Sequence, residues 1–392
     1  MINIILCSDS FKGTLSSGDI AKIGKDLVDR KYKDKVKLTT LLIADGGEGS
    51  LEAFSSFLEG ENIFVDTIDA EYRKINVNYF LSKENIAIIE ISKIIGLPMI
   101  KNTIKNTKRT TRGIGIVIKD AIKRGTKTVY ICLGGTSTVD FGIGMLEELG
   151  LKFDKKRDLC SEDLISIDDY DDKELLNNIR GVTFIGLSDV NNPLTGKYGA
   201  SYTFGPQKGF KRQELFNIEK GMMNISNIIK RKKNIDLSTY RGSGAAGGIG
   251  GAICSILNGT LKSGIDTLLE LADFKNLVKE NDIVITGEGS FDSQSLNGKV
   301  ISGILKYVNK DKLVIICGRN KIDDSKIKII ETSNGIFDMR YIKAHAKEMY
   351  QAALDKYLEY IVWLKNIFYE LIFFVIALQP TISTLLDMFY IT

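Results

Sequence analysis

The run Ile-Val-Ile at residues 283–285, which ends at the glycine-rich residues 287–289, constrains the fold more than any other feature of this sequence. A short run of β-branched residues predicts a buried strand. The polar residues that follow predict a loop, and they include Glu288, Ser290, Asp292, Gln294 and Lys299. Because the ligands of open α/β sheets bind at the carboxyl ends of strands, the pattern predicts an α/β fold with a ligand site at this loop.

The residue types in this loop suit a phosphorylated ligand. Glycine lets backbone N–H groups approach a phosphate, acids hold Mg²⁺, and lysine neutralises phosphate charge. The same pattern recurs where the apolar residues 41–43 lead into Asp45, Gly46, Gly47 and Glu48, and both loops contain Gly-Glu-Gly-Ser. Asp45, Glu48 and Glu288 are therefore candidate Mg²⁺ ligands. A metal site shared by the two loops requires both ends of the chain to lie in one domain.

Further loops draw on the same residue types, and several follow predicted strands. They lie at residues 8–13, 134–140, 188–194, 205–209 and 242–247. All the loops together supply the candidate ligand-binding residues Ser10, Gly46, Gly47, Gly134, Gly135, Thr136, Ser137, Asp140, Asn192, Lys208, Gly244, Ser290, Asp292, Gln294 and Lys299. Structural explanations compete with this interpretation: Ser137 or Asp140 as a helix cap, residues 188–194 as a turn, and the glycine-rich loop as tight packing of a helix on a sheet.

Predicted strands alternate with predicted helices along the chain, which indicates a parallel or mixed sheet in α/β layers. Strands are predicted at residues 2–7, 37–43, 86–91, 128–133, 183–187, 282–286 and 312–317. Helices are predicted at residues 18–32, 50–58, 112–123, 142–149, 210–230, 245–257 and 264–272. Residues 66–81 alternate polar and apolar side chains, as a hairpin does, and mark a domain boundary. We expect one domain formed by residues 1–66 and 281–392 and a middle domain formed by residues 67–280.

Composition narrows the class of protein. The formal net charge is +4 with acids and bases interspersed, so nothing favours nucleic acid binding. The five cysteines form no Cys-x-x-Cys pair, which fits a reducing cytoplasm rather than a zinc site. The single histidine, His345, is far along the chain from the glycine-rich loops, so proton transfer falls to Asp, Glu or Lys. Residues 360–378 are apolar but contain Lys365 and Glu370, which favours a packing helix or a terminal extension over a membrane span.

Residues 242–247, Gly-Ser-Gly-Ala-Ala-Gly, match the letters of a dinucleotide-binding fingerprint but not its context. That fingerprint follows a strand directly, whereas residues 235–241 have the composition of a loop. An anion-binding loop at a helix N-terminus is the better interpretation. The sequence contains no P-loop motif and no protein-kinase signature.

Taken together, the loops resemble those of the bacterial-type glycerate kinases. The matching segments run in order through residues 1–320: DSFKGTLSS (9–17), ADGGEGS (44–50), GGTSTVDFGIGMLEELG (134–150), SDVNNPLTG (188–196), GPQKG (205–209), GSGAAGGIGG (242–251) and DIVITGEGSFDSQSLNGK (282–299). Two residues depart from the family: Val139 stands where Asn is usual, and Phe141 stands where Gly is common, adding bulk expected near the pocket. The tail after residue 355 has no clear counterpart.

The resemblance implies two α/β domains, one Rossmann-like or flavodoxin-like with a mainly parallel sheet, and an active site in the cleft between them. It implies ATP and Mg²⁺, with D-glycerate as the phosphoryl acceptor and 2-phosphoglycerate favoured over 3-phosphoglycerate as the product, and it allows a homo-oligomer. Asp189 and Lys12 are the predicted catalytic residues, with Asp189 orienting or deprotonating the attacking hydroxyl. Lys12, Lys208 and Lys299 are candidate contacts to phosphate or carboxylate. A binding protein without turnover and an NAD-linked oxidoreductase are the alternatives.

Overall fold

The computed structural model describes residues 1–11, 13–155, 158–293, 295–296, 300–322, 326–333 and 338–389, without the side chains of residues 369 and 371–389. The chain divides into two compact units. Unit 1 consists of Met1–Leu41, Val278–Asp292 and Val308–Thr392, and unit 2 consists of Leu42–Leu277 and Ser293–Tyr307. Unit 1 thus joins the two ends of the chain, and unit 2 contains the middle.

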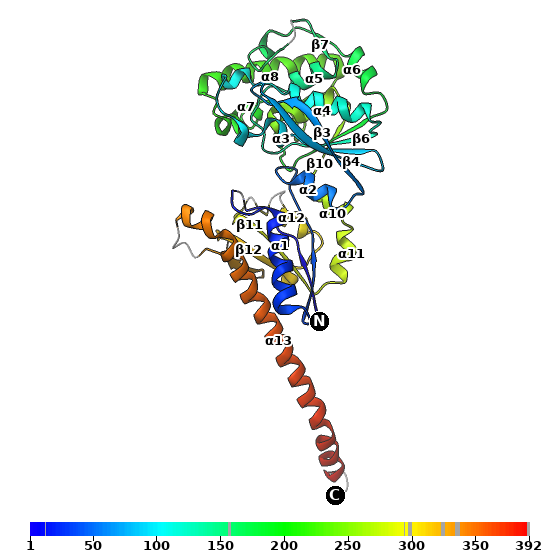
Figure 1. Cartoon of the computed structure of the whole chain (residues 1–392), viewed down its shortest axis with the longest axis vertical. Coiled ribbons are helices and arrows are strands. Elements are labelled where there is room, and N and C mark those ends of the chain that lie inside the picture. The colour runs from blue at the N-terminus through cyan, green and yellow to red at the C-terminus, as the bar shows by residue number, and fades with distance from the viewer. Residues whose placement is uncertain are drawn as a thin grey trace. The chain divides into compact units, whose positions relative to one another are not determined.

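Unit 1 contains a parallel sheet with the strand order β13-β12-β11-β1-β2 (Figure 1). The strands are β1 (Ile2–Leu6), β2 (Val36–Thr40), β11 (Ile283–Phe291), β12 (Leu313–Asn320) and β13 (Lys328–Glu331). The helices are α1 (Ser17–Leu27), its continuation η1 (Val28–Tyr32), η7 (Lys310–Lys312) and α13 (Met339–Phe389). This is the flavodoxin-like order 2-1-3-4-5, with the topological switch point between β1 and β11. The expectation of a flavodoxin-like parallel sheet is confirmed.

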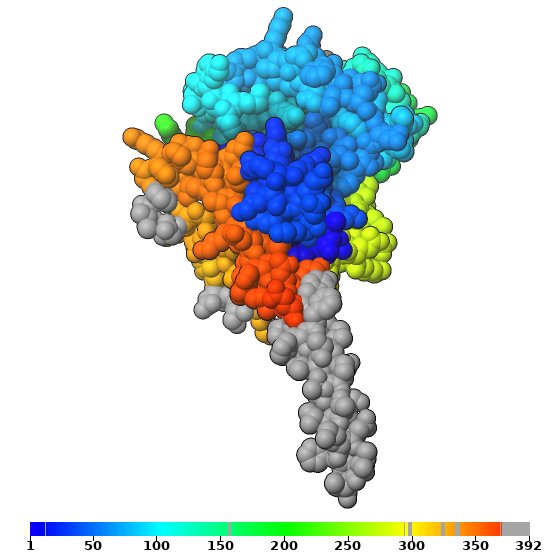
Figure 2. Space-filling model, turned by 60° about the horizontal axis from the view of Figure 1, so that its bottom comes forward, coloured from blue at the N-terminus to red at the C-terminus, as the bar shows by residue number. Residues whose placement is uncertain are grey.

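Helix α13 completes the core of unit 1. Tyr350, Leu354 and Leu358 are fully buried, and they pack with Phe11 and with residues of α1 in one apolar cluster. The N-terminal part of the chain and the first part of α13 lie side by side on the surface of unit 1, where α13 contacts α1 (Figure 2). Within the described residues, we find no helix that combines the length and the apolar character needed to span a membrane.

Unit 2 contains a mixed sheet with the strand order β10-β9-β6-β5-β4-β3. Its strands are β3 (Gly60–Ile68), β4 (Lys74–Ser82), β5 (Ile86–Glu90), β6 (Thr128–Cys132), β9 (Thr183–Leu187) and β10 (Thr260–Lys262), and β7 (Lys152–Phe153) pairs separately with β8 (Tyr170–Asp171). The helices that begin before residue 180 are α2 (Ser50–Ser55), α3 (Ser92–Ile95), η2 (Leu97–Met99), η3 (Asn106–Lys108), α4 (Arg112–Lys123), α5 (Ile143–Leu149), η4 (Leu164–Ser166) and α6 (Lys173–Asn178). Those that follow are α7 (Ala200–Phe204), η5 (Pro206–Lys208), α8 (Arg212–Lys233), η6 (Ala245–Gly248), α9 (Ile249–Ser255), α10 (Gly264–Leu271), α11 (Phe274–Lys279) and α12 (Val300–Ile304).

The predicted hairpin is longer than the sequence indicated, and it belongs to unit 2. Strands β3 and β4 pair in antiparallel fashion from Gly60 to Ser82, and β4 also pairs with β5. Tyr79 of β4 donates its hydroxyl to Asp120 of α4 at 2.9 Å, so the hairpin is fixed to the helix that covers it. Unit 1 runs to Leu41 and resumes at Val278, and Ser293–Tyr307 belongs again to unit 2. The domain boundaries at residues 66 and 281 stay a prediction.

Strand β11 also differs from its predicted extent. The strand was expected to end before Gly287, but it continues to Phe291 because β12 pairs with it as far as Asn320. Glycine permits this close pairing: a Cβ on Gly287 would lie 1.9 Å from the carbonyl oxygen of Ile316. The glycines of the opening motif thus lie within a strand.

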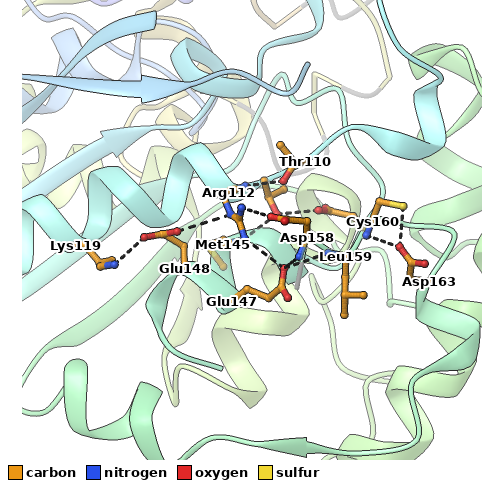
Figure 3. A network of polar contacts seen from close by, with 12 residues as sticks. Thr110, Arg112, Lys119, Met145, Glu147, Glu148, Asp158, Leu159, Cys160 and Asp163 are labelled. Atoms are coloured by element: carbon orange, nitrogen blue, oxygen red, sulfur yellow. Dashed lines mark hydrogen bonds and ion pairs between the residues drawn. The ribbon is translucent and has the colours of Figure 1, made fainter. Parts of the chain in front are cut away.

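A network of ion pairs holds α4, α5 and the charge-rich residues 154–170 together (Figure 3). Arg112 of α4 pairs with Asp158 and with Glu148 of α5, and Lys119 pairs with Glu148 at 2.7 Å. The carboxylate of Glu147 accepts the backbone N–H groups of residues 158 and 159 at 3.2 Å. Because α5 directly follows the loop of residues 134–141, the network fixes the helix on which that loop ends.

Candidate functional site

Four strands of unit 2 end at one edge of its sheet. β5, β6, β9 and β10 are all parallel neighbours, so the segments that follow them lie along the same carboxyl edge. Glu90 ends β5, Gly134 follows β6, Asp189 follows β9 and Ser263 follows β10. This edge therefore gathers residues that are far apart in the sequence.

The predicted loop of residues 44–50 lies on this same edge. The N–H of Gly134 donates to the carbonyl oxygen of Gly46 at 2.9 Å. Glu90 accepts the N–H groups of Gly49 at 3.3 Å and Leu51 at 2.9 Å, which fixes the loop at the start of α2. A Cβ on Gly134 would lie 2.4 Å from the Cα of the neighbouring Gly47, so the two glycine pairs 46–47 and 134–135 meet backbone to backbone.

Asp189 is the carboxylate at the centre of this edge. Its Oδ1 accepts the N–H of Gly264 at 3.1 Å, whereas its Oδ2 is buried and has no hydrogen-bond partner among the described residues. The pKa of Asp189 is raised to about 7, chiefly by burial and also by the negative charge of Asp45, while a hydrogen bond from Ser263 limits the rise. A buried carboxylate oxygen without a partner can accept a proton or a hydroxyl from a bound ligand.

A pocket of about 270 Å³ opens at Asp189 and is lined entirely by residues of unit 2. Its walls come from the segments after β9 and β10, from the start of the glycine-rich loop at Arg241 and Gly242, and from helix α12 with the residues that follow it. The N–H of Ser188 donates to the carbonyl oxygen of Lys262 at 3.0 Å, so two of these segments are tied together beside Asp189.

Several predicted ligand contacts in the 134–140 loop lie in the protein interior instead. Lys208 is 4% exposed, and its ammonium donates to the hydroxyl of Thr136 at 3.0 Å and to the carbonyl oxygen of Thr138 at 2.7 Å. Burial lowers the pKa of Lys208 to about 7. Ser137 donates to the carbonyl oxygen of Ile95 at 2.8 Å.

Asp140 is likewise enclosed. It accepts the hydroxyl of Thr111 at 2.8 Å and the N–H of Gly142 at 3.2 Å, just before α5 begins. Burial raises the pKa of Asp140 to about 6. The expectation of a helix cap by Ser137 or Asp140 is wrong, because Gly142 is the N-cap of α5 and no side chain caps that helix. Both side chains are instead held by hydrogen bonds in the interior.

Close packing also accounts for the glycine-rich loop. The N–H of Gly244 donates to the carbonyl oxygen of Asn192 at 2.9 Å, and the side chain of Asn192 donates to the carbonyl oxygen of Tyr198 at 2.8 Å. A Cβ on Gly244 would lie 2.3 Å from the carbonyl oxygen of Pro193, and a Cβ on Gly247 would lie 2.2 Å from that of Thr138. The loop does not follow a strand directly, which separates it from a dinucleotide fingerprint.

Phe141 belongs to the core rather than to the pocket. Its side chain is buried in the main apolar cluster of unit 2 and is not among the pocket-lining residues. Its backbone has a φ of 60°, the left-handed region in which a bulky residue is strained and glycine is not. This backbone conformation explains why glycine is the residue expected at position 141.

The remaining predicted site residues lie in unit 1 or outside the described residues. The N–H of Asp9, next to Ser10, donates to the carbonyl oxygen of Gly287 at 2.9 Å, which joins the loop after β1 to β11 at the switch point. Glu288 and Ser290 lie on β11, and Asp292 pairs with Lys321 at 3.7 Å. Lys12, Gln294 and Lys299 lie outside the described residues.

The structure also places at this edge residues that the sequence analysis missed. Arg241, Lys262 and Ser263 line the pocket, and Glu90 holds the loop of residues 44–50. Glu90 could have been found as an acid at the end of a predicted strand. Lys262 and Ser263 could not, because Thr260–Lys262 is too short and polar for its sequence to predict a strand.

A buried carboxylate, glycine-rich loops and cations at the carboxyl ends of four parallel strands are typical of an α/β enzyme that acts on a small anionic ligand. The glycerate kinase family model matches residues 4–362. Glycerate 2-kinase of Escherichia coli K12 is 29% identical over 368 residues, covering 90% of this chain and 94% of that protein. A glycerate kinase of Neisseria meningitidis serogroup B is 32% identical over 323 residues, covering 81% of this chain and 85% of that protein.

The fold agrees with these relatives. A crystal structure from Salmonella typhimurium LT2, assigned as a glycerate kinase 2, matches with a TM-score of 0.76 and 27% identity, covering 91% of this chain and 98% of that chain. The chain belongs to the glycerate kinase family and is therefore a phosphotransferase. Membership of the family implies glycerate and ATP as substrates.

Proposed function

We propose that the protein transfers the γ-phosphoryl group of ATP to the 2-hydroxyl of D-glycerate and releases 2-phosphoglycerate. The buried, unpartnered Oδ2 of Asp189 carries this proposal, because such an oxygen can accept the hydrogen of an attacking hydroxyl. The choice of the 2-hydroxyl is supported by the likeness to the glycerate 2-kinase of E. coli. The five buried thiols support a reducing compartment such as the cytoplasm.

In this proposal Asp189 is the base that orients and deprotonates the acceptor. The N–H of Gly264 holds Oδ1, while Oδ2 has no hydrogen-bond partner among the described residues. Phosphoryl transfer depends mainly on positioning and charge neutralisation, so a fixed carboxylate contributes chiefly by orienting the hydroxyl. Lys12 is proposed as a second catalytic residue that neutralises charge on the phosphoryl group.

The residues around Asp45 fit a magnesium ion bound together with ATP. Mg²⁺ is usually held by one or two carboxylates, while phosphates and waters complete its coordination. Asp45 lies close enough to Asp189 for its negative charge to raise the pKa of that residue. In the part of the chain that is described, no three ligating side chains form a cluster that could hold a metal ion. We propose Asp45 as the principal ligand, with Glu48 and Glu288 as further candidates. When bound, Mg²⁺ neutralises charge on the transferred phosphoryl group.

Glu48 belongs to unit 2 and Glu288 to unit 1, so a metal held by both stays a prediction. The same holds for an active site between the two units. The backbone N–H groups of Gly46 and Gly135 are proposed to bind phosphate, because those of Gly47 and Gly134 already donate to Asp45 and to the carbonyl oxygen of Gly46. The buried position of Lys208 favours a role in holding the 134–141 loop over direct contact with phosphate.

The proposal is tested by incubating the purified chain with ATP, Mg²⁺ and D-glycerate, following ADP release and identifying the product by ³¹P NMR. We expect ADP release that depends on D-glycerate, with 2-phosphoglycerate as the product. If 3-phosphoglycerate is formed, the assignment of the 2-hydroxyl is wrong, and if glycerate causes no ADP release, the proposed activity is wrong. Omitting Mg²⁺ and adding EDTA should abolish turnover.

A further inference from the structure

The pocket beside Asp189 carries cations that the proposed chemistry has not used. Its charged lining residues are Asp189, Arg241, Lys262, Asp266 and Lys306. The ammonium of Lys306 pairs with the carboxylate of Asp266 at 2.6 and 2.7 Å, so these two charges neutralise one another. Arg241 and Lys262 form no ion pair or side-chain hydrogen bond within the described residues. With Asp189 ionised, the pocket therefore retains an excess positive charge.

The backbone that carries these residues is well fixed. The carbonyl oxygen of Lys262 accepts the N–H of Ser188, the residue before Asp189. The loop that begins at Arg241 is joined to the segment that contains Asp189, because the N–H of Gly244 donates to the carbonyl oxygen of Asn192. Asp189 and the two cations consequently lie on three segments that are hydrogen-bonded to one another.

The size of the pocket limits the ligand. At about 270 Å³ it is below the range of roughly 300–1,000 Å³ that holds drug-sized ligands. A three-carbon hydroxy acid fits this volume, whereas a whole nucleoside triphosphate does not. A carboxylate placed close to Asp189 would be repelled unless cations offset the two negative charges.

We propose that Arg241 and Lys262 bind the carboxylate of the acceptor while its hydroxyl lies at Asp189, so that these two residues set the preference for hydroxy acids over neutral alcohols. Arginine binds carboxylates through paired N–H groups, and lysine adds a point charge. The inference rests on the proposed function, because it identifies which part of D-glycerate the pocket recognises. It assigns no role in the chemical step to either cation.

The test compares Arg241→Gln and Lys262→Gln with two matched controls. Arg180 and Lys127 are exposed, and they lie just before β9 and β6. They are thus at the amino ends of two strands whose carboxyl ends belong to the edge with Asp189. Arg180→Gln and Lys127→Gln therefore remove the same charges at the opposite edge of the sheet. Each protein is titrated with D-glycerate by calorimetry in the absence of ATP. Each is also assayed with ATP and either D-glycerate or its neutral methyl ester.

We expect each pocket variant to raise the Kd and the KM for D-glycerate by about tenfold or more, since a charge-assisted hydrogen bond is lost. The KM for the methyl ester should stay nearly constant, so the preference for the acid over the ester should fall. The control variants should behave as the wild type does. Thermal unfolding of every variant verifies that the fold is intact.

Unchanged D-glycerate affinity in both pocket variants would overturn the proposal. A rise in the KM for ATP alone would overturn it as well, because the cations would then be serving phosphate. Failure of the proposed function is a separate result: wild-type protein that binds D-glycerate without ADP release is not a glycerate kinase. The calorimetric comparison still tests the carboxylate subsite in that case, because it does not depend on turnover.

Discussion

At the scale of single residues, Asp189 links the fold to a measurable pH dependence. Its pKa is raised to about 7, first by burial and then by the charge of Asp45. A base acts only when deprotonated, so kcat/KM for D-glycerate should rise with pH and level off above about pH 7. A divalent cation at Asp45 lowers the pKa of a neighbouring carboxyl, so higher Mg²⁺ concentrations should shift the rise to lower pH.

Replacement of the carboxylate gives the matching control. Asp189→Asn keeps the size of the side chain but removes the base, and we expect kcat to fall by about 10²–10⁴-fold with the acidic limb lost. The free energy of unfolding depends on pH in the opposite direction to the activity. Because folding raises the pKa, the carboxyl stabilises the fold at low pH, and this contribution is lost as pH rises through about 7. An Asn variant with near wild-type turnover would exclude Asp189 as the base.

At Phe141, backbone strain and burial of the ring have opposite effects on the free energy of unfolding. Phe141→Gly relieves a left-handed backbone, worth about 1–2 kcal/mol, but it removes a buried phenyl group, which costs about 3–5 kcal/mol. We therefore expect a net loss of about 2 kcal/mol in the free energy of unfolding by urea denaturation. The KM for D-glycerate should not change, because the ring lies outside the pocket. A Gly variant as stable as the wild type would show that strain, not packing, dominates at this position.

At the scale of elements, the glycine-rich loop and the 134–141 loop depend on direct backbone contact. Gly247 has a φ of +69°, and its missing Cβ would lie 2.2 Å from the carbonyl oxygen of Thr138. Gly181 has a similar φ of +77° but nothing within 4 Å of its Cβ position. Gly181→Ala should therefore cost only the conformational strain of about 1 kcal/mol, and Gly247→Ala at least about 2 kcal/mol more. Equal losses in urea denaturation would contradict the close contact between the loops.

The same elements explain what the sequence could and could not predict. Apolar runs such as residues 128–133 and 183–187 predicted their strands, because a buried parallel strand is apolar throughout. The meeting of Asp45, Gly134 and Asp189 depends on the order of strands in the sheet, which no local pattern encodes. The burial of Lys208 was missed for a related reason: the partners that accept its hydrogen bonds, Thr136 and Thr138, are brought to it only by the fold.

At the scale of the whole molecule, α13 divides into a part that completes unit 1 and a part beyond the family match at residue 362. Tyr350, Leu354 and Leu358 are fully buried in the core of unit 1, and the buried residues of the helix extend to Val362. Removing residues 369–392 retains every buried side chain of α13 that the structure describes, because the last of them is Val362. We expect that truncation to leave the unfolding midpoint and kcat/KM for D-glycerate unchanged.

A second truncation, after residue 349, tests the other half of this argument. It removes six buried apolar side chains, from Tyr350 to Val362, and exposes the apolar residues of α1 that pack on them. Each lost core side chain costs about 2–5 kcal/mol, so the loss over all six is about 12–30 kcal/mol, which is as large as or larger than the total stability of about 5–15 kcal/mol that is usual for a domain. We therefore expect unit 1 to unfold, with loss of turnover and new ANS binding. A stable, active protein ending at residue 349 would mean that α13 is not part of the core.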